Sequence, residues 1–244
     1  MSELPAADPA ASGAPTHVAG SPRRPAGGPG PGIEVERGTA AEGLTVAGLD
    51  EVGRGAWAGP LTVGAVVLDL GAVPPGLRDS KRLTAGRRAV LSDALHASAA
   101  VGIGEVAHDE LDAVGLAAAL RLAAHRAVSA LPVEVDQVLI DGDVDLLAGS
   151  RWRTTTIVGG DDVSASVAAA SIVAKVHRDA WMCGVDPLHP VYGFAAHKGY
   201  PSPAHRAALA EHGPCALHRR SWRPIQRLLS EPQLPLATVP AAPS

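Results

Sequence analysis

Acidic side chains stand where three apolar segments of the chain end. Asp50 and Glu51 close the run LTVAGLDE, Asp141 closes VLID, and Asp161 and Asp162 follow TTTIVG. Carboxylates at the end of a buried segment cost free energy unless they are paired or bind a metal. No His or Cys motif accompanies them, so a hard ion such as Mg²⁺ or Mn²⁺ is the expected partner. Two such ions can activate water and stabilise the leaving oxygen of a phosphodiester.

Two features of these acids leave alternatives open. A single acid at a strand end is usually just solvated, and Asp162 is better explained as the N-cap of the helix that follows it. Neighbours on a regular strand point to opposite faces. Asp50 and Glu51 therefore serve one site only if the chain leaves regular geometry there, which Gly53 and Gly55 make easier.

Charge is distributed unevenly along the chain. The net charge is −4, yet residues 101–162 carry 11 acidic and 4 basic residues, whereas residues 171–230 carry 8 basic and 3 acidic ones. An acidic segment followed by a basic one is compatible with a metal site beside a phosphate-binding surface. Ordinary charge fluctuation explains the same pattern about as well.

The hydrophobic period changes along the chain in a readable order. Strands are expected at residues 44–50, 61–70, 100–107, 135–141 and 154–159. Helices are expected at residues 84–97, 109–131 and 163–181, with another from Ser202-Pro203 to Gly213. Short connections favour antiparallel pairing of the first three strands, and connections through helices favour parallel addition of the last two. The prediction is an α/β fold with a mixed sheet and helices packed on it.

The chain ends differ in composition from this central part. Residues 1–43 and 231–244 are rich in Pro, Ala and Gly, so we expect two disordered tails around one domain at residues 44–230. No apolar run is long enough to span a membrane, and no secretory signal is recognised. The two cysteines form no CxxC pair, which argues against a zinc site. A cytoplasmic monomer is the expectation.

Six sequence blocks occur in the order found in a known family. They are GLDEVGRGAWAGPLTVGAVVL, DSKRLT, VLIDG, AAASIVAKVHRD, YGFAAHKGY and HRRSW. Together they resemble ribonuclease HII over nearly all of residues 46–226. The resemblance implies a ribonuclease H-like fold, with a five-stranded mixed sheet flanked by helices and a C-terminal helical region.

The resemblance also implies a site of four carboxylates that holds two Mn²⁺ or Mg²⁺ ions. By motif these are Asp50, Glu51, Asp141 and Asp161, the last placed ten residues before Ser171. Asp179 is the alternative fourth acid, although it could simply pair with Arg178 or Lys175 late in a helix. The chain departs from the family pattern at two positions: Gly159 stands where Lys is frequent, and Asp143 where Asn is frequent. The extra acids Asp143 and Asp162 leave the choice of the fourth ligand open.

Substrate recognition is implied by other blocks. In the family, the backbone of the segment Gly53, Arg54 and Gly55 reads the ribose 2′-hydroxyl, the group that distinguishes RNA from DNA. Tyr200 matches a family tyrosine that stacks beside the ribonucleotide and its 3′ neighbour.

Basic side chains complete the expected substrate site. Lys81, Lys198 and Arg219 are expected phosphate contacts, although any one of them could equally be a solvated surface charge.

The hypothesis is an endonuclease that hydrolyses the RNA strand of RNA–DNA hybrids. It would also cut 5′ of ribonucleotides embedded in duplex DNA, as ribonucleotide excision repair requires, and leave 3′-hydroxyl and 5′-phosphate ends. A resolvase of the same fold and a non-catalytic hybrid-binding protein are the rivals. A weaker hypothesis is a sliding-clamp contact through Gln233, Leu234, Pro235 and Leu236.

Overall fold

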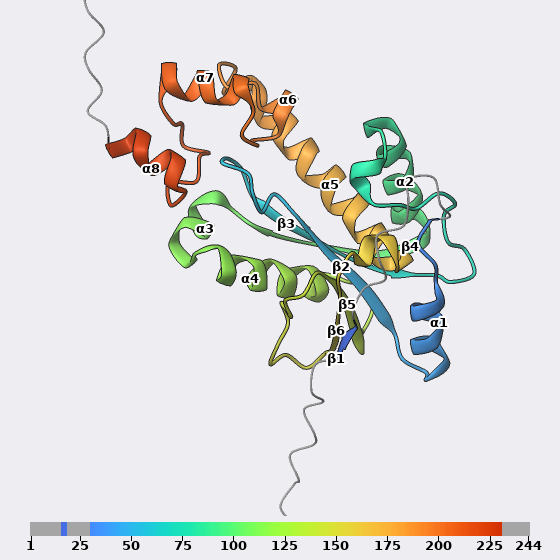
Figure 1. The fold of residues 1–244 in the computed structure, drawn as a ribbon. Helices are drawn as coiled ribbons and strands as arrows, with labels where there is room; N and C mark the ends of the chain where they lie inside the picture. Colours follow the sequence, from blue (N-terminus) through green and yellow to red (C-terminus); the bar gives the residue numbers. More distant parts are fainter. Residues whose placement is uncertain (1–15, 19–29, 231–244) are drawn as a thin grey trace, which may run out of the picture.

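The computed structural model describes residues 16–18 and 30–230 (Figure 1). Residues 233–236, the subject of the weaker sliding-clamp hypothesis, and most of the two expected tails lie outside the described residues. Within the described part of the chain, no helix combines the length and the apolar character that crossing a membrane requires.

A mixed sheet forms the centre of the molecule. Its strands are β1 (Thr16–Val18), β2 (Val46–Val52), β3 (Leu61–Leu68), β4 (Ala99–Val106), β5 (Gln137–Asp141) and β6 (Arg153–Ile157), in the spatial order β1-β6-β5-β2-β3-β4. Strands β2, β3 and β4 pair antiparallel, while β5 and β6 join parallel to β2. The five expected strands and their directions are therefore confirmed, and the short strand β1 extends the sheet beside β6.

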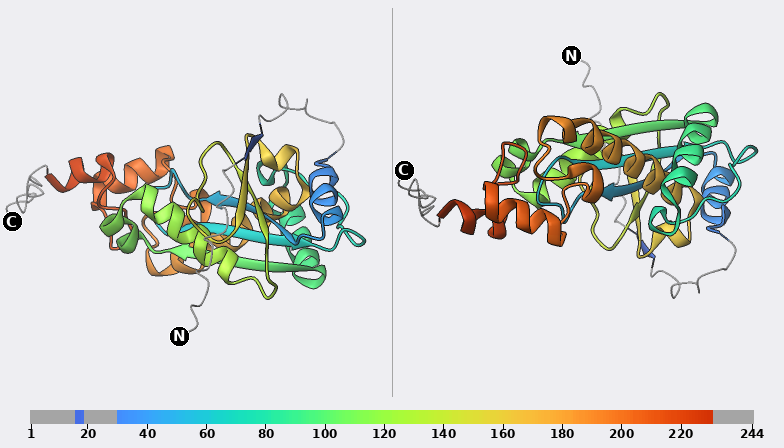
Figure 2. Two further views of the ribbon diagram at one scale, coloured as in Figure 1. Left: turned by 90° about the horizontal axis from the view of Figure 1, so that it is seen from below. Right: turned by 90° about the horizontal axis from the view of Figure 1, so that it is seen from above.

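Helices cover both faces of this sheet (Figure 1). They are α1 (Glu34–Ala41), α2 (Ala85–Ser98), α3 (His108–Val114), α4 (Leu116–Ser129), α5 (Ala165–Val185), α6 (Phe194–His197), α7 (Pro203–His212) and α8 (Arg223–Ser230). Helix α5 packs on β2 and β3 on one face, and α4 packs on β3 and β4 on the other. Helices α7 and α8 lie at one end of the molecule, beyond the sheet (Figure 2).

Glycines in the strands allow the two large helices to approach closely. A Cβ atom added at Gly48 would lie 2.1 Å from the carbonyl carbon of Ser166 in α5. One added at Gly104 would lie 2.0 Å from the carbonyl oxygen of Ala123 in α4. Because the core holds mostly small aliphatic side chains, backbone comes to lie almost directly on backbone.

Two expectations from the sequence were wrong. The single helix expected at residues 109–131 is two helices, because Gly115 adopts φ 80° between α3 and α4 and ends the first one. The expected disordered tail at residues 1–43 contains α1, whose Glu36 side chain is buried. One carboxylate oxygen of Glu36 accepts hydrogen bonds from the Ser164 hydroxyl at 2.6 Å and from the Ser166 N–H at 2.9 Å, at the start of α5.

Candidate active site

Three acids from distant parts of the chain meet at one edge of the sheet. Asp50 lies in β2, Asp141 ends the neighbouring strand β5, and Asp161 lies in a 3₁₀ turn just before α5. Each offers a carboxylate oxygen, and these oxygens all lie within 4.8 Å of one another. The pairing of Leu49 with Ile140 places the first two side by side. The convergence of three strand ends, expected from the sequence, is present.

Backbone N–H groups orient two of these acids. The Oδ1 atom of Asp50 accepts a hydrogen bond from the N–H of Glu51 at 2.7 Å. The Oδ1 atom of Asp141 accepts one from the N–H of Gly160 at 2.7 Å. Gly159, at φ 69°, turns the chain into the 3₁₀ turn that brings Gly160 there. The departure from the family pattern at position 159 therefore occupies a left-handed backbone position that glycine tolerates well.

Burial raises the pKa of every acid in this group, and repulsion between group members adds to this for Asp50 and Asp161. The pKa of Asp50 stands well above its ordinary value because the carboxyl is buried and because Asp141 and Glu51 repel its charge. The pKa of Asp161 rises to about 7, through burial and then through the charge of Asp141. An all-oxygen donor set that resists ionisation when no cation is near fits a hard divalent ion.

Glu51 stands apart from the other three acids. Strand β2 stays paired with β3 through Val52. The departure from regular strand geometry that would bring Asp50 and Glu51 to one face therefore does not occur. Asp50 faces α5, where its carboxylate meets the Ser171 hydroxyl, whereas Glu51 faces α4. Burial raises the pKa of Glu51, and the charge of Asp141 raises it further, so the two carboxylates interact across the sheet edge.

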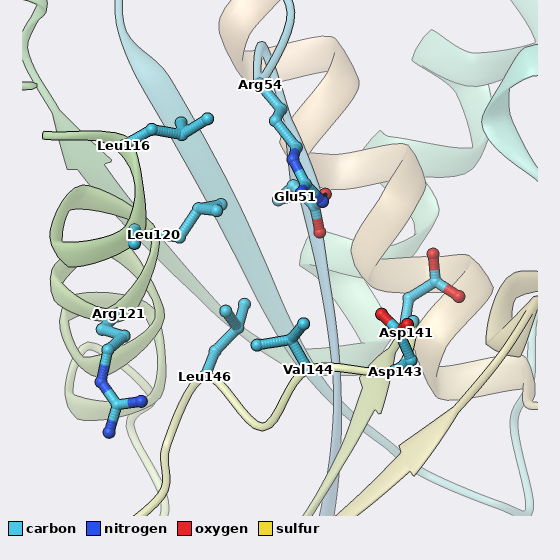
Figure 3. A pocket seen from close by; sticks show the side chains of 11 residues that line it. Glu51, Arg54, Leu116, Leu120, Arg121, Asp141, Asp143, Val144 and Leu146 are labelled. Carbon is cyan, nitrogen blue, oxygen red and sulfur yellow. Dashed lines mark ion pairs between the residues drawn. The ribbon is translucent and has the colours of Figure 1, made fainter.

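A pocket of about 490 Å³ opens beside Glu51 (Figure 3). Charged and apolar side chains share its lining: the charged ones include Glu51, Arg54, Asp141 and Asp143, and the apolar ones include Leu116, Leu120, Val144 and Leu146. Asp141 belongs both to this pocket and to the group of three acids. The fourth predicted acid is thus adjacent to the other three through Asp141, from the opposite face of the sheet.

The alternatives for the fourth acid separate clearly. Asp179 pairs with Lys175 at 2.7 Å, the structural role that the sequence allowed for it, and it does not belong to the acid group. Asp162 pairs with Arg82 at 3.1 Å. The N-cap of α5 is Ser164, whose hydroxyl accepts the Val167 N–H, so the capping role expected for Asp162 was wrong.

The segment that begins at Gly53 lies against Tyr200. The N–H of Gly53 donates to the Tyr200 hydroxyl at 3.0 Å, and Gly53 has φ 89°. Among the described residues, no hydrogen bond occupies the N–H of Arg54 or of Gly55, and both residues are exposed. The two motifs implied by the resemblance are therefore neighbours in space, although they are far apart in the chain.

Two buried arginines bind the backbone around residues 54–60 and at Lys198. The guanidinium of Arg178 donates to the carbonyl oxygens of Pro60, Ala58 and Lys198 at 2.8–3.0 Å. That of Arg219 donates to the carbonyl oxygens of Gly59, Pro60 and Arg54 at 3.0–3.3 Å. Because Arg219 is 0% exposed and its donors serve the backbone, the expected phosphate contact was wrong for this residue.

The remaining cations lie nearer the surface. The Lys81 side chain is 78% exposed and lies 3.9 Å from Asp79. Burial lowers the pKa of Lys81, but the charges of Asp79 and Asp50 outweigh this effect and raise it above its usual value. The ammonium of Lys198 donates to the carbonyl oxygen of Ala195, and Arg54 lies 3.6 Å from Glu51.

Sequence reasoning used Ser171 only as a landmark and missed its contacts. Its hydroxyl interacts with the Asp50 carboxylate and lowers the pKa of that acid. Its hydroxyl oxygen also lies within hydrogen-bond distance of the Ser80 hydroxyl, at 2.8 Å. Ser171 thus ties the acid group to the turn that carries Lys81, and the serine at the end of the AAAS block was the available signal.

Comparison with known proteins decides the family. The model of the family Ribonuclease HII matches residues 47–225. The chain belongs to the ribonuclease HII family. The ribonuclease HII of Streptomyces avermitilis is 51% identical over 184 residues, which cover 75% of this chain and 78% of that protein. That of Sinorhizobium medicae is 45% identical, covering 85% of this chain and 96% of the relative.

Solved structures agree with this membership in ribonuclease HII. The ribonuclease H2 of Pyrococcus horikoshii matches with a TM-score of 0.65 and 27% identity, over 76% of this chain and 97% of that one. Ribonuclease HII in a complex with PCNA from Archaeoglobus fulgidus matches with a TM-score of 0.63 and 26% identity, over 74% and 96%. The ribonuclease H-like fold is therefore confirmed. The chain is a divalent-metal-dependent ribonuclease H that cuts the RNA strand of RNA–DNA hybrids.

Proposed function

We propose that the chain cuts on the 5′ side of ribonucleotides, including single ribonucleotides embedded in duplex DNA. The products are a 3′-hydroxyl and a 5′-phosphate. Asp50, Glu51, Asp141 and Asp161 hold two Mg²⁺ or Mn²⁺ ions. The single observation that carries this proposal is the meeting of three carboxylate oxygens within 4.8 Å, with Glu51 reached through Asp141.

Each acid has its own part in this site. When bound, two divalent ions lower the pKa of the attacking water and stabilise the leaving oxygen. Asp141 belongs both to the three-acid group and to the lining of the pocket beside Glu51, so it would help to hold the ions together with acids on both sides. Asp50 and Asp161 would bind the ions from the face of the sheet that α5 covers, and Glu51 would bind them from the face that α4 covers.

Recognition of the ribose falls to the segment beside the acids. The N–H of Gly53 is used by Tyr200. The N–H groups of Arg54 and Gly55 have no partner among the described residues and can donate to a ligand. A 2′-hydroxyl can accept from such groups, and a deoxyribose offers them nothing. The Tyr200 ring lies beside this segment and supplies a surface on which a base or sugar stacks.

Positive charge near the acids supports phosphate binding. The charges of Asp50, Asp141 and Asp161 raise the pKa of the Lys81 ammonium. The ammonium therefore lies near enough to the acids to bind a phosphate placed over them. Lys198 lies two residues before Tyr200 in the chain. We assign the phosphate contacts to Lys81 and Lys198, which are at least partly accessible, unlike Arg219.

One gel assay tests the proposal. A duplex with a single ribonucleotide, a full RNA–DNA hybrid and a plain DNA duplex are each incubated with Mg²⁺ or Mn²⁺, and again with EDTA. We expect 5′ cleavage of the first two, no cleavage of DNA, and no reaction in EDTA. Failure to cut the single-ribonucleotide duplex would limit the activity to continuous hybrids.

Two variants test the choice of acids. Asp50→Asn should abolish cleavage while the protein stays folded, because it removes a central carboxylate charge. Asp179→Asn is the matched control and should cleave at close to the wild-type rate, because Asp179 pairs with Lys175 instead of the acid group. Near wild-type cleavage by Asp50→Asn would show that the metal assignment is wrong.

A further inference from the structure

We propose that two buried histidines, His205 and His218, are positioning residues for Tyr200 and thereby set how strongly a ribonucleotide is recognised. The inference rests on the proposed role of Tyr200. His205 lies in α7 and His218 in the segment before α8, and neither touches the acid group. Both are almost completely buried, at 0% and 1% exposure.

The two imidazoles form one hydrogen-bond chain with a fixed direction. The Nδ1 atom of His205 lies 3.0 Å from the carbonyl oxygen of Tyr200. A carbonyl oxygen can only accept, so this nitrogen carries the hydrogen and the Nε2 atom of His205 is left as an acceptor. The Nε2 atom of His218 lies 3.0 Å from it and must therefore donate.

The far end of the chain confirms this choice of tautomers. With the hydrogen of His218 on Nε2, its Nδ1 atom is an acceptor. The backbone N–H of Cys215 donates to that atom at 3.0 Å. The Sγ atom of Cys215 also lies 3.2 Å from that nitrogen. Every ring nitrogen then has a partner of the right kind, and the hydrogen-bond chain runs from Cys215 through both histidines to Tyr200.

Burial keeps both rings neutral, as this chain requires. It lowers the pKa of His205 and of His218 to about 4. A proton added to His205 would place two N–H groups face to face at its 3.0 Å contact with His218. A proton added to His218 would do the same at its 3.0 Å contact with the backbone N–H of Cys215. His197 stacks on His205 with ring centroids 4.4 Å apart, so the ring is also held in its plane.

Tyr200 needs such an anchor because of the backbone that leads to it. Lys198 and Gly199 both have positive φ, at 53° and 78°. A non-glycine residue in that region is strained, and the turn persists only where its surroundings hold it. His205 fixes the carbonyl of Tyr200, and the N–H of Gly53 meets its hydroxyl at 3.0 Å. Tyr200 is thus held both at its backbone and at the hydroxyl end of its ring.

Two replacements of His205 separate its two hydrogen bonds. An asparagine amide reaches about as far as Nδ1, so His205→Asn keeps a donor for the Tyr200 carbonyl. A glutamine amide reaches about as far as Nε2, so His205→Gln keeps the contact with His218 and loses the one with Tyr200. We expect His205→Gln to lower kcat/KM on a single-ribonucleotide duplex about tenfold, and His205→Asn by less than about threefold.

His212→Gln provides the matched control. It makes the same substitution in the same helix, but its side chain is 38% exposed and faces Glu211. It should leave kcat/KM unchanged. Melting curves of all variants give the fraction folded at the assay temperature, and rates are compared per folded molecule.

A double-mutant cycle decides whether His205 acts through Tyr200. In a Tyr200→Ala background, His205→Gln should have almost no further effect on kcat/KM. The inference is overturned if the tenfold loss persists in that background, or if His205→Asn loses as much as His205→Gln. If Tyr200→Ala alone leaves cleavage at the embedded ribonucleotide unchanged, the proposed role of Tyr200 fails, and the positioning role fails with it.

Discussion

The hydroxyl of Tyr200 accepts the backbone N–H of Gly53 at 3.0 Å, across 147 residues of sequence. This bond joins the turn between α6 and α7 to the residue that follows β2, the strand that carries Asp50 and Glu51. The Arg178 guanidinium lies 5.3 Å from the centre of the Tyr200 ring and also donates to backbone beyond Gly53. The segment that we propose to recognise the sugar is therefore attached to the strand that carries two of the acids.

The first prediction separates the ring of Tyr200 from its hydroxyl. Tyr200→Phe keeps the ring and loses one hydrogen bond, so kcat/KM on a single-ribonucleotide duplex should fall by about two- to tenfold. Tyr200→Ala also loses stacking worth about 1–3 kcal/mol, and should fall by about ten- to a hundredfold or more. Steady-state kinetics on a labelled duplex measures both. Equal losses in the two variants would show that the ring contributes nothing.

The second prediction concerns repulsion among the acids in metal-free protein. The pKa of Asp161 rises to about 7 on folding, so the folded state holds a proton there that the unfolded chain releases from about pH 4 upward. This acid therefore costs stability increasingly as pH rises from about 4 to about 7. In EDTA, Asp161→Asn should match the wild type near pH 4 and melt at least about 2 °C higher at pH 7.

Metal provides the control for this prediction. Millimolar Mg²⁺ or Mn²⁺ binds the folded wild type and stabilises it by mass action, so the advantage of Asp161→Asn should shrink or reverse at pH 7. Taking the difference between two proteins at each pH cancels the acid-side titration of His205 and His218. A difference in melting temperature that does not change with pH would contradict the repulsion described for this site.

The acid site was largely readable from sequence because strand ends are readable. Asp50 and Asp141 each follow an apolar run, and parallel neighbours bring such ends together. Glu51 was harder, because its direction depends on whether β2 continues past Asp50. The strand does continue, paired through Val52, and so Glu51 faces the opposite side from Asp50. Alternation along a strand predicted this, and the expected break in geometry did not occur.

Buried polar residues were the part that sequence could not assign. Arg219 and Glu36 have ionisable side chains, and on sequence alone such side chains are most often solvated. Their burial depends on partners far away in the chain: the carbonyl oxygens near Gly59 for Arg219, and Ser164 with Ser166 for Glu36. Helix α1 is predictable only once that anchor is known, because the composition of the segment favours disorder.

The third prediction tests the anchor of α1. Glu36→Ala removes the acceptor of three hydrogen bonds at the buried start of α5, and should cost about 2–3 kcal/mol in the free energy of unfolding. Glu42→Ala, at an exposed position at the end of the same helix, should change it by less than about 0.5 kcal/mol. Urea titrations measure both. If the two variants proved equally stable, α1 would contribute nothing to the fold.

The fourth prediction concerns the closeness of β2 and α5. A Cβ atom at Gly48 would lie 2.1 Å from the Ser166 carbonyl carbon and 2.3 Å from the Val167 nitrogen, and neither backbone atom can move cheaply. Gly48→Ala should therefore cost about 3 kcal/mol or more in the free energy of unfolding. It should also reduce cleavage, because Asp50 lies two residues further along β2 on the same face.

Gly38→Ala is the control: Gly38 is exposed within α1, and no neighbouring atom lies within 4 Å of the added Cβ. That change should stabilise the protein by about 0.5–1 kcal/mol. Wild-type stability of Gly48→Ala in the same urea titration would disprove the close packing of this strand against α5.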